Sequence, residues 1–180
     1  MLIVERISLR VATKSDAEML LGWYNIPEYW GDFYNVWPTS IEAVEERIRK
    51  WHENEGNLYI ITDRATSEPM GTGGYYSPHA ASYRTVFPDF EVWYHVRPQF
   101  RRQGVASQTA RLLINQLFLA TSIERLTAFV VADNEGSSRV LDLAGMQRKG
   151  RWRRMMLLHG KWVDILLYGI LRSEWHNDTE

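Results

Sequence analysis

One short segment of the sequence combines residue types that hold phosphate groups in proteins. It stands between a predicted strand and a predicted amphipathic helix and reads Arg101-Arg102-Gln103-Gly104-Val105-Ala106. At such a junction the first N–H groups of the helix lack partners and point the same way as the positive end of the helix dipole, which suits a pyrophosphate. Gly104 can adopt a positive φ, and the small Ala106 lets a phosphate approach the main chain. An ordinary helix start is the alternative, because the segment is neither a Walker loop nor a dinucleotide fingerprint.

A second stretch has the composition of a pocket wall. Aromatic residues concentrate between Trp23 and Trp37, where no clean helical or strand period continues beyond Asn25. Irregular segments rich in aromatic rings tend to line pockets, and aromatic faces attract cations. We therefore predict a substrate wall built by Glu28, Tyr29, Trp30, Phe33, Tyr34 and Trp37, with Tyr75 and Tyr76 added from a glycine-rich strand. Glu28 and Asp32 could hold a positive charge; a solvated loop, or a packing or dimer surface, is the alternative.

Alternating strands and helices must position these residues. Period-two and continuous apolar patterns predict strands at 7–12, 58–62, 70–76, 90–96, 126–131, 151–158 and 162–171. Helices are predicted after Thr13 or Ser15, from Ser40, over 105–119 and over 136–143. Glycines 71, 73 and 74 predict a bulge or a close backbone approach, and His159-Gly160-Lys161 predicts a hairpin turn. This order of elements predicts a mixed α/β fold.

The bulk composition excludes several classes of protein. The chain has 180 residues, a formal net charge of −1 and no cysteine, so we expect one domain over 1–180 without disulfides or thiolate sites, and we predict no metal site. No apolar run approaches the length of a spanning helix and no signal-peptide core is evident, so we expect a cytoplasmic protein away from the membrane. Five cationic residues lie between Arg148 and Arg154, and such a run is typical of a solvated strand edge. The alternatives are that this cluster docks on ribosomal RNA or binds an acidic substrate, although the near-neutral net charge disfavours nucleic acid.

Four segments in order resemble the GNAT superfamily of N-acetyltransferases. The 101–106 segment is similar to its Arg/Gln-x-x-Gly-x-Gly/Ala motif, and 91–98, running into it, resembles the RimJ/RimL-like branch. Asn134-x-x-Ser137-x-x-Val140-Leu141-x-x-x-Gly145-Met146 resembles the fourth-helix motif of that branch. Residues 160–164, followed by Tyr168, Leu171, Glu174 and Trp175, resemble its C-terminal strand. With the opening strand and helix, the resemblance covers essentially the whole chain.

The resemblance implies a fold and a co-substrate. The fold is a mixed, mostly antiparallel sheet of about seven strands, splayed at a central parallel pair formed by 90–96 and 126–131 and flanked by about four helices. The co-substrate is acetyl-CoA, with its pyrophosphate on the amides of 102–106 and its pantetheine paired to the strand. The residues implied in binding it are Tyr94, His95, Val96, Arg101, Arg102, Gln103, Gly104, Val105, Ala106, Asn134 and Ser137. For Asn134, a helix N-cap is an equally good reading.

The resemblance also implies an amine acceptor and therefore a base. An alkylammonium has a pKa near 10.4, so an amine must lose a proton to react at pH 7. Glu91 matches the strand glutamate that some members use; a carboxylate among aromatic rings has a raised pKa and attracts a cation, although Glu91 could also be a structural carboxylate. His95 could relay a proton or could be a packing residue.

The sequence offers fewer candidates for the residue that protonates the departing thiolate. Ser137 matches a serine that the RimJ/RimL-like branch uses near the leaving thiolate, with helix capping as the alternative. Many members place a tyrosine acid seven residues after the asparagine, but here that position is Leu141. Protonation of the thiolate therefore falls to Ser137 or water, and a main-chain N–H near Val96 would hold the oxyanion.

The sequence does not distinguish among four classes of amine acceptor: protein N-termini, polyamines, aminoglycosides and small amino compounds. A coenzyme A-binding regulator without turnover is the non-enzymatic alternative, because the tyrosine acid is missing.

Overall fold

The computed structural model describes residues 6–53, 56–77 and 89–176. The strands are β1 Ile7–Val11, β2 Asn57–Asp63, β3 Pro69–Tyr76, β4 Asp89–Val96, β5 Arg125–Val131, β6 Gln147–Leu158 and β7 Lys161–Leu171. The α-helices are α1 Ala17–Tyr24, α2 Pro27–Trp30, α3 Ile41–Glu53, α4 Val105–Ala120 and α5 Glu135–Leu143. Short 3-10 turns lie at Lys14–Asp16, Pro98–Phe100 and Arg172–Glu174. The predicted strands and helices are therefore confirmed, apart from shifts at their ends and the additional α2.

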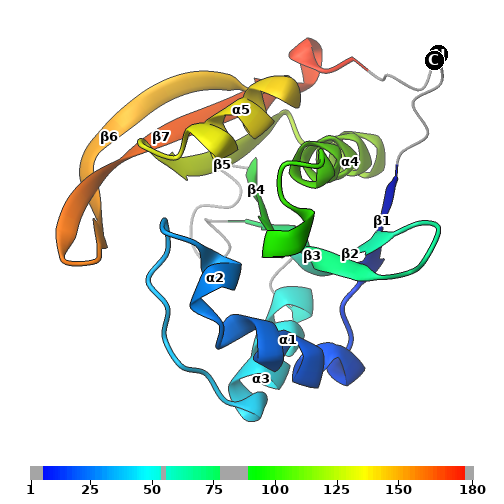
Figure 1. Ribbon diagram of the computed structural model, residues 1–180. Helices are drawn as coiled ribbons and strands as arrows, with labels where there is room; N and C mark the ends of the chain where they lie inside the picture. The colour runs from blue at the N-terminus through cyan, green and yellow to red at the C-terminus, as the bar shows by residue number, and fades with distance from the viewer. Residues whose placement is uncertain (1–5, 54–55, 78–88, 177–180) are drawn as a thin grey trace.

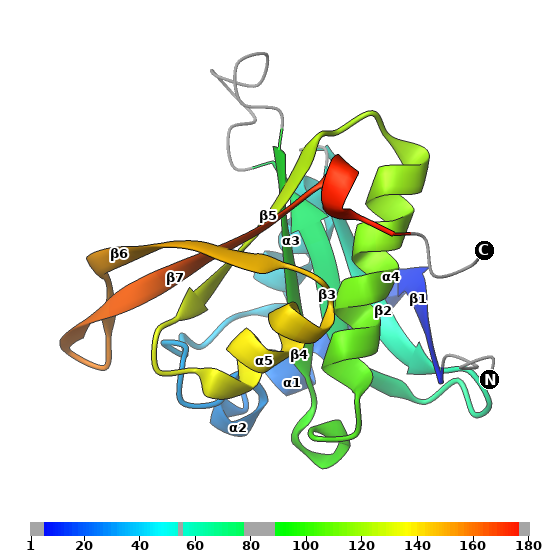
Figure 2. The ribbon, with the colours of Figure 1, turned by 90° about the horizontal axis from the view of Figure 1, so that it is seen from above.

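All seven strands form one sheet in the order β1-β2-β3-β4-β5-β7-β6. Every neighbouring pair is antiparallel except β4 and β5, which are parallel and are paired only over Asp89–Glu91 and Arg125–Thr127. Beyond these residues the two strands diverge toward the loop that precedes α4 (Figure 2). The predicted mixed sheet, splayed at a central parallel pair, is confirmed.

Helices cover both faces of this sheet (Figure 1). On one face, α4 and α5 bury Leu113, Leu117 and Leu141 against the strands in the largest core cluster. On the other face, α1 and α3 bury Leu20 and Val44 together with strand residues of β2. No helix within the described ranges combines the length and apolarity needed to cross a bilayer.

The glycines of β3 are explained by close backbone approaches. A Cβ on Gly71 would collide with the main-chain oxygen of His95, and one on Gly74 would collide with that of Asn57. A Cβ on Gly73 would lie 2.9 Å from the Cγ2 atom of Thr109 on α4. The strand register also shifts opposite this stretch, between Ile61 and Thr62. Without side chains at these positions, α4 and β4 can both lie tightly against β3.

The aromatic segment is more regular than its sequence suggests. Pro27 starts the one-turn helix α2, at a position where its missing N–H costs nothing. Gly31, with φ +72°, ends the helix while its N–H donates to the Pro27 carbonyl at 3.0 Å. A single turn is too short to produce a periodic pattern, so the expectation of an irregular loop was wrong for these residues.

The last two strands form a long hairpin that projects from the body (Figure 1). The predicted turn is confirmed: His159 and Gly160 both have positive φ, 46° and 78°, as a tight two-residue hairpin turn requires. β6 begins at Gln147 rather than at Arg151, because an exposed edge strand needs main-chain pairing but no apolar face. Between Trp152 and Met156 its register shifts, and Arg154 takes φ 50°.

Candidate functional site

A pocket of about 670 Å³ opens where β4 and β5 separate. Four parts of the chain line it: the α2 segment, the end of β4, the loop into α4 with its first turn, and one side of α5 from its N-cap to its last residue. From the predicted coenzyme residues it contains Tyr94, His95, Val96, Arg101, Arg102, Gly104, Val105, Ala106, Asn134 and Ser137. From the predicted substrate wall it contains Tyr29, Trp30, Phe33 and Tyr34. The fold therefore gathers residues more than 100 positions apart around one space.

The start of α4 has the geometry of an anion-binding helix terminus. Gly104 precedes the helix in the left-handed conformation, with φ +80°. The N–H of Gln108 donates to the Gly104 carbonyl at 3.0 Å as a first helical hydrogen bond. The preceding N–H groups, of Val105, Ala106 and Ser107, thus have no acceptor within the helix, and all three residues line the pocket. They can donate to a phosphate at the positive end of the helix dipole.

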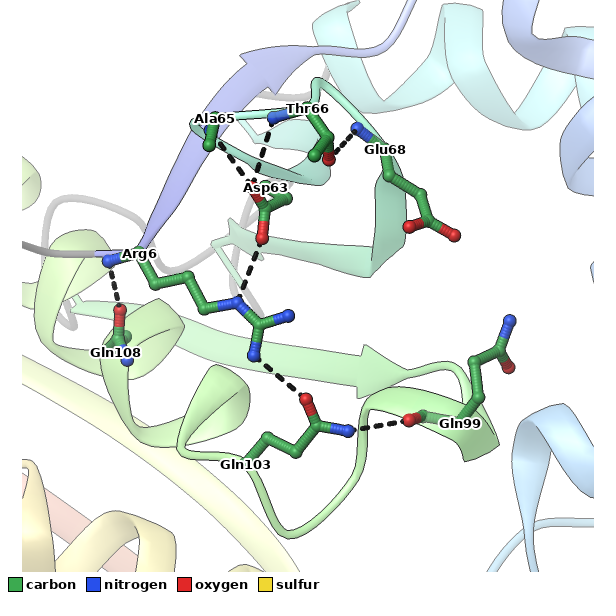
Figure 3. A network of polar contacts seen from close by, with 8 residues as sticks. All are labelled: Arg6, Asp63, Ala65, Thr66, Glu68, Gln99, Gln103 and Gln108. Carbon is green, nitrogen blue, oxygen red and sulfur yellow. Dashed lines mark hydrogen bonds and ion pairs between the residues drawn. The ribbon is translucent and has the colours of Figure 1, made fainter.

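Gln103 lies outside the pocket lining and holds this loop from behind (Figure 3). Its Oε1 accepts from Nη1 of Arg6 at 2.8 Å, and its Nε2 donates to the Gln99 carbonyl at 2.7 Å. Arg6 also donates through Nε to Asp63 at 2.9 Å and through its main-chain N–H to Gln108 at 2.9 Å. The network therefore ties the loop and α4 to the edge of β1 and β2. No pattern in the sequence pointed to Arg6.

Arg101 connects the two sides of the pocket. Its Nε donates to the carbonyl of Val96 on β4 at 3.0 Å. Its Nη2 donates to the carbonyls of Glu28 and Tyr29 in α2, at 2.6 and 2.9 Å. The guanidinium is thus already engaged by main-chain oxygens, and its charge lies at the C-terminal end of α2, where a cation is favourable.

The open edge of β4 supplies further main-chain groups. The N–H of Arg97 donates to Met70 on β3 at 2.9 Å, and these groups alternate sides along a strand. Those of Tyr94 and Val96 therefore point toward β5. In the described part of the chain β5 is paired with β4 only as far as Glu91, so an extended ligand could add to this edge like a strand.

The first turn of α5 brings Asn134 and Ser137 to the pocket. Asn134 is the N-cap, and its Oδ1 accepts from the N–H of Ser137 at 3.0 Å. The capping role left open by the sequence is thus present. The Nδ2 group of the same amide has no hydrogen-bond partner in the described ranges, and Asn134 lines the pocket, so this donor is available to a ligand.

Tyr94 reaches α5 from β4 across the open end of the sheet. Its hydroxyl lies 3.0 Å from Oγ of Ser137 and 3.4 Å from the Ser137 carbonyl. Burial raises the pKa of the Tyr94 phenol, partly offset by the hydrogen bond with Ser137. The phenol therefore stays protonated well above neutral pH.

His95 lies in a cage of aromatic rings. The rings of Tyr34, Trp30, Trp93 and Tyr29 have centroids 4.7, 4.9, 5.8 and 6.0 Å from its own. This burial, with the charge of Arg101 adding to it, lowers the pKa of His95 to about 4. The imidazole is therefore neutral at physiological pH, and as a pocket-lining residue it can accept a proton or a hydrogen bond.

Glu91 lies deeper along β4, outside the lining of the pocket. Its carboxylate accepts a hydrogen bond from the hydroxyl of Tyr76. Its charge also contributes, after burial, to raising the pKa of Tyr34, which does line the pocket. The charge of Glu91 is therefore close enough to act on a phenol that lines the pocket.

The other predicted wall residues occupy different surroundings. The Glu28 side chain is exposed outside the lining, whereas its carbonyl accepts from Arg101. Trp37 is 78% exposed and also lies outside. Tyr75 packs against Phe90, with ring centroids 5.0 Å apart, and Tyr76 borders a second, more open pocket of about 730 Å³ beside α3.

The cluster of cations on β6 behaves as an exposed strand edge. Arg151 donates to Asp164 at 2.6 Å, and Asp164 also accepts from the N–H of Arg154 at 2.8 Å. These bonds lower the pKa of Asp164 and hold the irregular part of β6. Elsewhere, the described residues hold no group of three or more His, Asp or Glu side chains placed for a metal ion.

Comparisons with known proteins agree with this geometry. A family model described as an acetyltransferase (GNAT) domain matches residues 6–147. The uncharacterized N-acetyltransferase YoaA of Bacillus subtilis is 29% identical over 175 residues, 93% of this chain and 94% of that protein. Among solved structures, the ribosomal-protein acetyltransferase RimL in complex with coenzyme A is similar with a TM-score of 0.80 at 19% identity, covering 94% of this chain and 96% of that one. The spermidine N-acetyltransferase of Vibrio cholerae, in complex with coenzyme A and spermine, has a TM-score of 0.79 at 17% identity, covering 94% and 97%.

Proposed function

This chain belongs to the GNAT acetyltransferase family, and we propose that it moves the acetyl group of acetyl-CoA to a primary amine by direct attack of the amine on the thioester. Within the family we propose the RimJ/RimL-like branch, because four motifs follow in the order of that branch and RimL shares the fold. The chain would act as a single domain over 1–180.

One observation carries the proposal: two sets of main-chain donors that have no partner among the described residues face one pocket. The N–H groups at the start of α4 suit a pyrophosphate, and the open edge of β4 at Tyr94 and Val96 suits an extended amide-containing arm. The Nδ2 of Asn134 lies across the same space as a further donor for that arm. Coenzyme A, a pyrophosphate joined to a pantetheine amide chain, matches both sets.

The acetyl group would lie beside the N–H groups of Tyr94 and Val96. A main-chain N–H near Val96 is then the donor for the oxyanion that forms when the amine adds to the carbonyl. Such a donor is preorganised by the pairing of β4 with β3, so it does not have to reorganise during the reaction.

Glu91 is the proposed general base, acting through Tyr34 or a water, because its carboxylate lies behind the pocket wall. His95 is the alternative, since it is neutral and faces the pocket directly. The two residues are four positions apart on one strand, with Cα atoms about 13 Å apart, and of the two only His95 lines the pocket. Substitution of each residue in turn therefore separates the two roles.

The acceptor is proposed to enter between α2 and β4. Trp30, Phe33 and Tyr34 line this side of the pocket above the buried Tyr29, and Asp32 adds a carboxylate. Aromatic faces with a nearby carboxylate suit an ammonium group. Both a protein N-terminus and a small amine or polyamine fit this chemistry.

The experiment is a thiol-release assay with acetyl-CoA and an amine panel, with products identified by mass spectrometry. The panel contains peptides with free N-termini, polyamines, aminoglycosides and small amino compounds. We expect acetyl transfer to at least one class at a rate well above hydrolysis. Coenzyme binding without turnover on any class would favour a coenzyme A-binding regulator instead, and absence of binding would refute the proposal.

A further inference from the structure

The fifth helix offers no phenol to the pocket. Its residue 141 is a leucine, only 1% exposed, and it packs in the core cluster between α4 and the sheet. A tyrosine placed seven residues after Asn134 is therefore absent both in sequence and in space. A phenol at this end of the pocket therefore has to come from another element.

Tyr94 brings such a hydroxyl from the opposite side. Both Tyr94 and Ser137 line the pocket, and their hydroxyl oxygens are 3.0 Å apart. Tyr94 belongs to the strand whose open edge is proposed to hold the pantetheine arm. Ser137 lies in the first turn of α5, where the Asn134 cap fixes its main chain. The two hydroxyls thus meet at the end of the pocket that the thioester is proposed to reach.

We propose that Tyr94 positions the hydroxyl of Ser137 on the leaving sulfur. In this hydroxyl pair Tyr94 donates to Oγ of Ser137, and Ser137, whose place near the thiolate the family resemblance already implies, donates to the sulfur. The inference rests on the proposed function. Ser137 is then the catalytic residue and Tyr94 a positioning residue that orients and polarises it. The direction of donation leaves the Ser137 proton free for the ligand.

The step balances without proton transfer from the pair. The nitrogen–carbon bond forms, the carbon–sulfur bond breaks with its electron pair on sulfur, and the coenzyme leaves as a thiolate that solvent protonates. The amine gives up its protons to the general base and solvent. A thiol has a pKa of about 8.5 and a phenol about 10, so the proton stays on oxygen and the pair stabilises the charge by hydrogen bonding.

Few other titratable groups face the pair. Tyr34 and Tyr168 are close enough for each to add to the raised pKa of Tyr94, and both are phenols. Arg139 lines the same pocket from α5, and Arg102 lines it from the loop. Coenzyme A and desulfo-coenzyme A meet the same surrounding groups, so a difference between them that changes with pH reports on the thiol.

The test compares the affinities of coenzyme A and desulfo-coenzyme A, measured by titration calorimetry from pH 7 to pH 9.5. For the wild-type chain we expect the affinity ratio to shift toward coenzyme A as the thiol ionises. Ser137→Ala and Tyr94→Phe should each reduce that preference at pH 9.5 by about tenfold, the effect of losing one hydrogen bond to a charged group. The affinity for desulfo-coenzyme A should stay within about twofold.

Two further variants distinguish a catalytic pair from a structural contact. Ser137→Thr keeps a hydroxyl and should retain most of the preference, and the double variant should be no worse than either single one, because both disrupt one chain of bonds. If Ser137→Ala and Tyr94→Phe keep the wild-type ratio of affinities for coenzyme A and desulfo-coenzyme A, the hydroxyl pair is refuted and the proposed function is not affected. Failure of the wild-type chain to bind either coenzyme would overturn both.

Discussion

The side chain of Arg101 donates a hydrogen bond to the main-chain carbonyl of Tyr29, 72 positions earlier in the chain, at 2.9 Å. Arg101 precedes the helix whose start is proposed to hold the pyrophosphate, and Tyr29 lies in the proposed acceptor wall. The same guanidinium donates to Val96 on the strand between them. One residue therefore links the coenzyme side of the pocket to the acceptor side.

Arg101→Met should weaken the binding of both substrates, because it removes the hydrogen bonds that join α2 to β4 while it keeps the aliphatic part of the side chain. We expect the KM values for the amine and for acetyl-CoA each to rise about five- to tenfold, measured by steady-state kinetics. Arg102→Met is the matched control: Arg102 also lines the pocket, and no hydrogen bond of its side chain is found in the described ranges. It should raise only the KM for acetyl-CoA. Equal effects of both variants on the amine would contradict the link.

Gly104→Val should abolish the thermal stabilisation by acetyl-CoA, because a β-branched residue does not tolerate φ +80° and would displace the N–H groups of the helix start. The free protein should stay folded, since space beside this position is open apart from Gln108. Gly104→Asn is the control, because asparagine adopts the left-handed region more easily. A full shift of the melting temperature in Gly104→Val would show that the phosphate site lies elsewhere.

Gln103→Leu should raise the KM for acetyl-CoA about two- to fivefold with little change in kcat. The substitution cuts the bonds from Arg6 and to the Gln99 carbonyl that brace the loop from behind, without removing a group that lines the pocket (Figure 3). Gln99→Ala serves as the control, because Gln99 takes part in this network through its main chain. An unchanged KM in Gln103→Leu would mean that the loop keeps its shape without the network.

Truncating Trp30 or Tyr34 to alanine should raise the KM of the amine far more than that of acetyl-CoA, since both residues line the proposed acceptor side of the pocket. Trp37→Ala provides a matched aromatic control, being 78% exposed and outside the pocket. Loss of uniform binding leaves kcat nearly intact, whereas a fall in kcat alone would indicate a misplaced amine. If neither kinetic constant of the amine changes, the acceptor binds elsewhere.

Glu91→Gln should lower kcat by roughly 10²–10⁴ if the carboxylate is the base, with little change in coenzyme affinity. His95→Gln should then have a smaller effect. The reverse order, or a pH–rate profile that Glu91→Gln leaves unaltered, would transfer the role to His95 or to water.

The neutral His95 should make the fold sensitive to mild acid. Its folded pKa of about 4 lies below the unfolded value of 6.5, so the unfolded chain binds more protons between these values. This contribution to stability is present above pH 6.5 and is lost as pH falls toward 4. Between pH 7.5 and 5 we expect a loss of about 2 kcal/mol in the free energy of unfolding, measured by urea denaturation. His95→Gln should lose markedly less over the same range.

The sequence alone determined the order of strands and helices and the position of the helix start that we propose as the phosphate site. Both depend on local properties: apolar periodicity selects strands or helices, and Gly104 before an amphipathic helix leaves free N–H groups wherever the helix is placed. The splayed parallel pair at β4 and β5 was expected only from family resemblance. From the sequence, Leu141 showed only that the usual tyrosine is absent. Its place in the core became known from the structure.

Only the tertiary structure decided which side chains meet. The contact between Tyr94 and Ser137 spans 43 positions, the bond from Arg101 to Tyr29 spans 72, and that from Arg6 to Gln103 spans 97. The tertiary structure also places Gln103, Trp37 and Glu91 outside the pocket, which their residue types and sequence neighbours did not indicate. Local patterns record which face of an element is apolar, whereas the direction of a polar side chain depends on partners that the register of the sheet and the packing of the helices bring near.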